Sequence, residues 1–132
     1  MEIIPFQSIG PLAFGDKRED IRIKLGGNFS PFRKVAGECM TDTYDSLGLH
    51  LYYDENGHLE FVEAFEPALV TISGVNFLGK SLPAALREME LLGFTHEDAD
   101  VGVDFPAVGI AITVTSEVIE GVAAYRKGYY DD

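Results

Sequence analysis

The sequence has one cysteine, few basic residues and no long hydrophobic run. The single Cys39 cannot form a disulfide within the chain, so we expect a small buried side chain there, with no nucleophilic role. No apolar stretch approaches the roughly 18 residues of a membrane helix, and the start lacks the basic-then-apolar pattern of a signal peptide. We therefore expect a cytoplasmic protein that does not associate with a membrane.

Hydrophobic residues make up 46% of the 132 residues. This fraction is enough for one compact domain with a core of its own, and no low-complexity tract or Ser/Pro-rich linker divides the chain. A single domain spanning residues 1–132 is the expectation.

The charge is strongly negative, because 10 Lys and Arg oppose 22 Asp and Glu and give a formal net charge of -12. Such a field repels phosphate backbones and anionic lipids and attracts basic partners, so we expect no binding to nucleic acid. Two interpretations stay open: the acidity maintains solubility only, or it forms an acidic face for a basic partner.

The stretch GVNFLGKS, Gly74–Ser81, matches the phosphate-binding pattern G-x-x-x-x-G-K-[ST] between a strand-like and a helix-like run. Its bulky Phe77 and Leu78 suit packing under a helix better than surrounding an anion. We therefore interpret the stretch as structural, with Ser81 capping a helix and Lys80 pointing to solvent.

An internal repeat supports this interpretation. The stretch IGPLAFGDK, residues 9–17, has the same glycine spacing but carries Asp16 where Lys80 stands in the other copy. Each copy precedes an amphipathic run that ends on Leu-Gly, at residues 25–26 and 92–93, where glycine can adopt the left-handed cap conformation. Asp16, with Glu19 as its capping-box partner, is predicted to cap the first helix.

Alternating apolar residues predict a hairpin after each helix, with strands at 47–53 and 59–65, and at 108–114 and 118–124. Further strands are expected at residues 34–40, 69–73 and 101–105.

The register of the first hairpin follows from a three-residue loop, Glu55–Gly57. This loop pairs Tyr53 with Leu59 and Leu51 with Phe61, so that the apolar residues share one face.

The predicted fold class is α+β. Two tandem α-β-β modules, residues 8–72 and 73–132, are expected to form one antiparallel sheet with two helices on one face.

This order resembles the fold group of the small outer-membrane assembly lipoproteins (SmpA/BamE-like) and the tandem-module β-lactamase inhibitor protein, through the motifs FGDKREDIRIKLGG and LGKSLPAALREMELLGF. It is also similar to small bacterial immunity-like proteins. The chain departs from these groups in lacking a lipoprotein signal, a lipidated N-terminal Cys and the disulfides of a secreted inhibitor. The resemblance implies a protein-binding scaffold whose sheet offers a broad face to a partner.

No metal, catalytic or cofactor site is predicted. In the expected register His50 and His58 lie roughly 13 Å apart, too far to share one zinc, and His96 is remote in the sequence. The acidic stretch HEDADVGVD, residues 96–104, lacks the glycine and the terminal glutamate of an EF-hand loop. No serine lies in a nucleophile-elbow sequence.

The outer face of the first hairpin and the C-terminal tail supply the predicted protein-binding residues. Val62 is expected on the same outer face. Aromatic side chains provide rigid contact area, and acidic groups steer a basic partner. The predicted site residues are His50, Tyr52, Asp54, His58, Glu60, Tyr129 and Tyr130.

The sequence therefore favours a non-enzymatic scaffold, an immunity or inhibitor type of protein that binds a basic protein. One alternative is a small-molecule-binding or catalytic domain with a pocket between helices and sheet. Another is self-assembly as a homodimer through an unpaired sheet edge.

Overall fold

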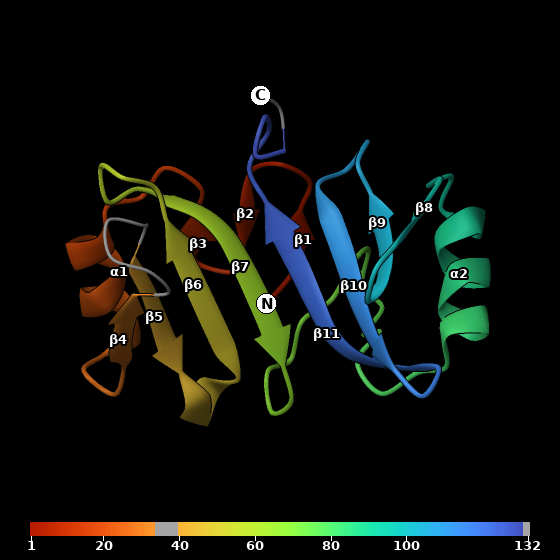
Figure 1. Ribbon diagram of the computed structural model, residues 1–132, viewed down its shortest axis with the longest axis horizontal. Helices are drawn as coiled ribbons and strands as arrows, with labels where there is room; N and C mark the ends of the chain where they lie inside the picture. The colour runs from red at the N-terminus through yellow and green to blue at the C-terminus, as the bar shows by residue number, and fades with distance from the viewer. Residues whose placement is uncertain (34–39, 131–132) are drawn as a thin grey trace.

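A computed structural model of the chain describes residues 1–33 and 40–130 (Figure 1). These residues form two α-helices, one short 3-10 helix and eleven strands. Their bounds are β1 (Ile3–Ile4), β2 (Ser8–Ile9), β3 (Leu12–Ala13), α1 (Arg18–Leu25), β4 (Ser30–Arg33), β5 (Met40–Tyr44), η1 (Asp45–Leu47), β6 (Leu49–Tyr53), β7 (Leu59–Phe65), α2 (Leu82–Leu91), β8 (Glu97–Ala99), β9 (Gly102–Phe105), β10 (Ile110–Thr115) and β11 (Val118–Tyr125).

Eight strands form one antiparallel sheet in the order β4-β5-β6-β7-β11-β10-β9-β8. Helix α1 precedes β4 to β7 and helix α2 precedes β8 to β11, so the two halves of the chain meet where β7 pairs with β11. The α+β class is confirmed, and each half contributes four strands to the sheet. A second, three-stranded sheet of β1, β2 and β3 was not predicted.

The core lies on one face of the large sheet. The buried Ile21 of α1, Met89 of α2 and Leu12 of β3 belong to one hydrophobic cluster with the inward side chains of the sheet. Figure 1 shows the two helices at opposite ends of the sheet and β1 to β3 behind its middle. The opposite face of the sheet, toward the viewer, is left uncovered by these elements. Neither helix has the length and apolar character needed to cross a bilayer.

The expected cap of α2 is confirmed, whereas that of α1 is wrong. Ser81 Oγ accepts a hydrogen bond from the Ala84 amide. The N-cap of α1 is Lys17, which makes no side-chain cap hydrogen bond. Asp16 instead accepts hydrogen bonds from the Ala13 amide at 3.0 Å and from Lys24 Nζ at 3.2 Å, so its carboxylate holds the turn before the helix.

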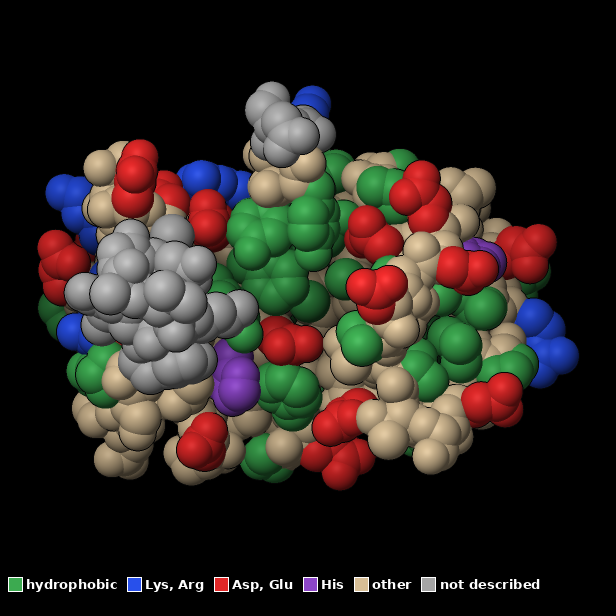
Figure 2. Space-filling model, viewed as in Figure 1, with side chains coloured by type: hydrophobic (Ala, Val, Ile, Leu, Met, Phe, Trp, Pro, Cys, Tyr) green, Lys and Arg blue, Asp and Glu red, His purple; other side chains and the backbone are tan. Residues whose placement is uncertain are grey.

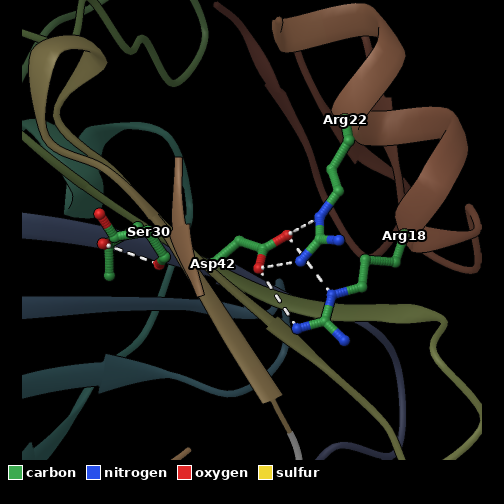
Figure 3. Close-up of polar contacts among 5 residues, drawn as sticks. Arg18, Arg22, Ser30 and Asp42 are labelled. Carbon is green, nitrogen blue, oxygen red and sulfur yellow. Dashed lines mark hydrogen bonds and ion pairs between the residues drawn. The ribbon is translucent and has the colours of Figure 1, made fainter. Parts of the chain in front are cut away.

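A buried ion-pair cluster attaches α1 to the sheet (Figure 3). The Asp42 side chain of β5 is fully buried and accepts hydrogen bonds from Arg22 Nε and Nη2, both at 2.8 Å. Arg18 donates to the same carboxylate at 3.2 and 3.4 Å. Burial alone would raise the pKa of Asp42, but the hydrogen bonds from the two guanidinium groups outweigh burial and hold it below its usual value.

The segment Gly74–Ser81 is bonded to the fold through its own amides. Those of Gly79 and Lys80 donate to the carbonyls of Ile119 and Phe77. The Lys80 ammonium pairs with Glu88 of α2 at 3.0 Å, and Phe77 is buried. A phosphate loop needs these amides and the lysine free to face an anion, and here they have other partners.

The first hairpin follows the expected register at its turn and departs from it further along the strands. Tyr53 pairs with Leu59, as predicted. A β-bulge beside this pair places Phe61 opposite Tyr52, not opposite Leu51 as expected. The extra residue reverses the facing of every residue that follows it on β7.

The reversal corrects the predicted outer face. Val62, expected on the outer face, is fully buried in the core. Phe61, expected on the apolar inner face, lies on the uncovered face, and so does Glu63, which is opposite His50.

The remaining predicted strands have mixed outcomes. The hairpin of β10 and β11 is confirmed, with a turn at Ser116 and Glu117, both at positive φ. Strand β9 confirms the strand expected at 101–105. Residues 69–73 form only isolated bridges, of which one joins Thr71 to Glu2. The strand expected at 34–40 lies almost entirely outside the described residues, as does Cys39.

Candidate functional site: the open face of the sheet

The uncovered face of the eight-stranded sheet, called the open face below, is organised in three rows that run across the strands. Each row consists of residues that are direct partners on neighbouring strands. The aromatic row is Tyr125, Phe61, Tyr52 and Thr41; the acidic row is Asp104, Ala111, Ala123, Glu63, His50 and Thr43; the third row is Gly102, Thr113, Gly121 and Phe65.

The aromatic row is extended by the C-terminal tyrosines into an aromatic cluster of Tyr52, Phe61, Tyr125, Tyr129 and Tyr130. Phe61 stacks on Tyr125 with ring centroids 6.1 Å apart and meets Tyr52 edge-on at 5.3 Å. Tyr129 and Tyr130 pack against Tyr125 with centroids 5.8 and 5.0 Å away. The geometries are the offset and edge-to-face arrangements that aromatic pairs prefer, so the cluster is a preformed surface.

Figure 2 shows this cluster as a large hydrophobic patch in the upper middle of the open face, with acidic side chains beside and below it. The Lys and Arg side chains visible among the described residues lie toward the margins. Tyr130 is 61% exposed, so the edge of the cluster is available to a partner.

Tyr125 connects the aromatic cluster to the acidic row. Its hydroxyl donates a 2.7 Å hydrogen bond to Asp104 Oδ1. Burial, this hydrogen bond and the charge of Asp104 all raise the pKa of Tyr125 well above its usual value. The Asp104 carboxylate is thereby held in place by a neutral donor.

Glu63 is positioned in the same way three strands away in the acidic row, where it accepts a 3.3 Å hydrogen bond from Thr113 Oγ1. No ion pair among the described residues involves Glu63 or Asp104. Within the described part of the chain, both carboxylates therefore lack a cationic partner.

A groove of about 370 Å³ lies between these groups. Its floor is made of small residues, among them Ala111 and Ala123. A Cβ at Gly102 would lie 1.9 Å from the Ile112 carbonyl oxygen, so this floor position requires glycine. Phe61 and Tyr130 line the groove together with Glu63 and Asp104.

Four of the predicted site residues lie on this face. His50 and Tyr52 belong to the acidic and aromatic rows, and Tyr129 and Tyr130 belong to the aromatic cluster.

The other three predicted residues lie around the turn of the first hairpin, where two of them bind a basic residue of the chain. Arg126 pairs with Asp54 at 3.0 Å and with Glu60 at 2.9 Å. Asp54 also accepts hydrogen bonds from the backbone amides of Asn56 and His58. Burial would raise the pKa of Asp54, but these hydrogen bonds and Arg126 lower it. These carboxylates fasten the C-terminal segment to the hairpin, and both share one cationic partner, Arg126.

Sequence reasoning missed Phe61, Glu63, Asp104 and Tyr125. The first two were assigned to the inner face because the bulge was not anticipated. Asp104 lies on β9 and Tyr125 on β11. The pairing of β7 with β11, which brings Phe61 and Glu63 beside the second half of the chain, joins residues far apart in the sequence.

Among the described residues, no group of three or more His, Cys, Asp or Glu is placed to hold a metal ion. Compared with models of known protein families, with curated proteins and with solved structures, the chain matches none of them. Its resemblance to the assembly lipoproteins and the β-lactamase inhibitor stays a prediction.

Proposed function

We propose that this protein is a non-enzymatic protein-binding module whose open face binds a basic protein. The observation that carries the proposal is the aromatic cluster, exposed at Tyr130, beside two carboxylates without an ion-pair partner among the described residues. In the same proposal, the module is a cytoplasmic protein of the immunity or inhibitor type.

The aromatic cluster supports this function because tyrosine and other large aromatic residues supply much of the binding energy at protein interfaces. Their rings bury a large area at a small cost in side-chain entropy. The packing of five rings against one another restricts them further before a partner arrives.

The charge supports a basic partner. A net charge of -12 raises the rate of encounter with a cationic protein, and this contribution falls as salt increases. Glu63 and Asp104 place carboxylates beside the rings, whereas Asp54 and Glu60 are already paired with Arg126.

A second candidate function is the binding of a small molecule, which is favoured by the groove beside Tyr130. Its volume of about 370 Å³ is at the lower end of the range for ligand pockets. In this second candidate the ligand binds on the open face, whereas the sequence suggested a pocket between the helices and the sheet.

The test is affinity capture from an extract of the cells that make the protein, at low and at high salt, followed by mass spectrometry. Two open-face variants, Tyr130→Ser and Glu63→Gln, are compared with Leu91→Ser and Glu90→Gln on α2. Each control makes the same kind of change on a different surface: an exposed hydrophobic residue becomes Ser, and an exposed Glu becomes Gln. Leu91 is 87% exposed, and Glu90 is also exposed.

We expect a basic protein to be retained at low salt and in a smaller amount at high salt. The two open-face variants should retain less of this protein than the two controls. Retention of no protein, or equal retention by all four variants, would overturn the proposal. Release of a small molecule on denaturation, without a retained protein, would favour the second candidate.

A further inference from the structure

We propose that the groove of the open face is a slot for an arginine side chain of the basic partner, with the guanidinium against the Tyr130 ring and between Glu63 and Asp104. This inference rests on the proposed function and names the chemical group that the site recognises.

The acidic row sets the dimensions of the slot. Asp104 and Glu63 are the ends of a four-residue run across β9, β10, β11 and β7, with Ala111 and Ala123 between them. Three strand spacings separate the two Cα atoms, which corresponds to roughly 14 Å. The alanines between them are small, and the Glu63 side chain reaches across β11 to Thr113, so both carboxylates line the groove that a side chain would enter from above.

The groups around the slot favour a cation. Thr113 and Tyr125 each donate one hydrogen bond to these carboxylates, which leaves other oxygen lone pairs available. Both donors are neutral, so neither places a positive charge beside the carboxylates. Partial burial, and then the charges of Asp104 and Glu63, raise the pKa of Tyr130.

Arginine fits the slot better than lysine for two reasons. Its planar guanidinium can stack on an aromatic ring while its edge donates to a carboxylate, whereas an ammonium is a compact and strongly hydrated charge. The lining provides both contacts in one place, since Phe61 and Tyr130 stand beside Glu63 and Asp104.

The size of the groove is in keeping with a single inserted side chain. A volume of about 370 Å³ lies near the lower limit of the pockets that hold whole drug-sized ligands. The adjoining aromatic cluster would contact the backbone and neighbouring side chains of the partner segment.

The experiment is a titration of the ¹⁵N-labelled protein with three capped tripeptides, Gly-Arg-Gly, Gly-Lys-Gly and Gly-citrulline-Gly, followed by amide chemical shifts. Citrulline keeps the planar shape of the arginine side chain without its charge, and lysine keeps the positive charge without the planar guanidinium group. The same titration is made with Glu63→Gln and with the control Glu90→Gln.

We expect saturable shifts at the amides of Gly102, Ala111 and Ala123 with the arginine peptide, about fivefold weaker binding of the lysine peptide, and weaker binding still of the citrulline peptide. Glu63→Gln is expected to weaken binding of the arginine peptide about fivefold, and Glu90→Gln to leave that binding unchanged.

Equal binding of the arginine and lysine peptides, shifts confined to other parts of the protein, or no shifts at all would each overturn the arginine slot. The proposed function is decided separately by the capture experiment, because a basic protein can be retained by the open face without an arginine in the groove. Failure of the slot and failure of the module are therefore distinguishable.

Discussion

The ring of Phe61 lies almost parallel to the ring of Tyr125, at an interplanar angle of 7° and a centroid distance of 6.1 Å. Phe61 belongs to β7, the last strand of the first half, and Tyr125 to β11, the last strand of the second half. The two residues are direct partners in the strand pair that joins the halves. The aromatic cluster is therefore built by both halves of the chain, and the candidate site depends on their junction.

Replacement of Phe61 by Ala is expected to weaken this junction. The ring is half-buried and contacts three tyrosines, so we expect the free energy of unfolding to fall by about 1–2 kcal/mol. Urea denaturation followed by circular dichroism measures the change, with Phe61→Leu as a control that keeps apolar volume. An unfolding free energy equal to that of the unchanged protein would show that the stack adds nothing to the junction.

The tyrosines are expected to resist ionisation in the folded protein. Burial raises the pKa of Tyr44, Tyr52, Tyr53 and Tyr125 above their usual value. A raised pKa in the folded state gives a stability contribution that is complete below the unfolded value of about 10 and is lost as pH rises above it.

The measurement is absorbance at 295 nm during an alkaline titration, together with circular dichroism. We expect most of the tyrosinate signal to appear together with unfolding. Ionisation of most tyrosines near pH 10 while the chain stays folded would contradict the burial of these hydroxyls.

Asp42 is expected to be important for stability at neutral pH. Asp42→Asn removes the charge that pairs with Arg18 and Arg22, and we expect a loss of about 3 kcal/mol, near the lower limit for a broken buried pair because the two arginines are partly exposed.

The pH dependence of this loss identifies its cause. Since the folded pKa of Asp42 is lowered, its contribution is present above the unfolded value of about 4 and is lost as pH falls further. The difference in unfolding free energy between the two proteins should therefore narrow below about pH 4. A difference that stays constant down to pH 2 would point to a packing defect instead of a lost charge.

The segment GVNFLGKS is expected not to bind nucleotide. Its amides and the Lys80 ammonium already have partners in the fold. Addition of millimolar ATP with Mg²⁺ should leave the thermal midpoint unchanged, and Lys80→Ala should change stability by less than about 0.5 kcal/mol because the pair with Glu88 is partly exposed. A rise of several degrees with ATP, abolished by Lys80→Ala, would return the segment to a phosphate-binding role.

The local features of the fold were readable from the sequence. The Leu-Gly ends of the helices, the cap at Ser81 and the hairpin of β10 and β11 depend on residues within a few positions of one another. Such local features can be predicted from the spacing of glycines and from the alternation of apolar and polar residues.

The candidate site was predicted only in part because it depends on long-range pairing and on one extra residue. Without the bulge beside Tyr53, Glu63 would face the core, and the acidic row would end at Ala123. Alternation alone cannot locate a bulge, since a single inserted residue exchanges the two faces of the strand. The tyrosines of the tail were named as site residues from the sequence, but the packing of Tyr129 on Phe61 required the three-dimensional structure.

The most direct test of the open face as the binding surface is the footprint of the captured basic protein on the ¹⁵N-labelled chain. We predict that the amides of Phe61, Glu63, Ala111, Ala123 and Tyr130 broaden or shift when the partner is added, while those of α1 and α2 do not. A footprint on the helices that leaves the open-face amides unchanged would contradict the account.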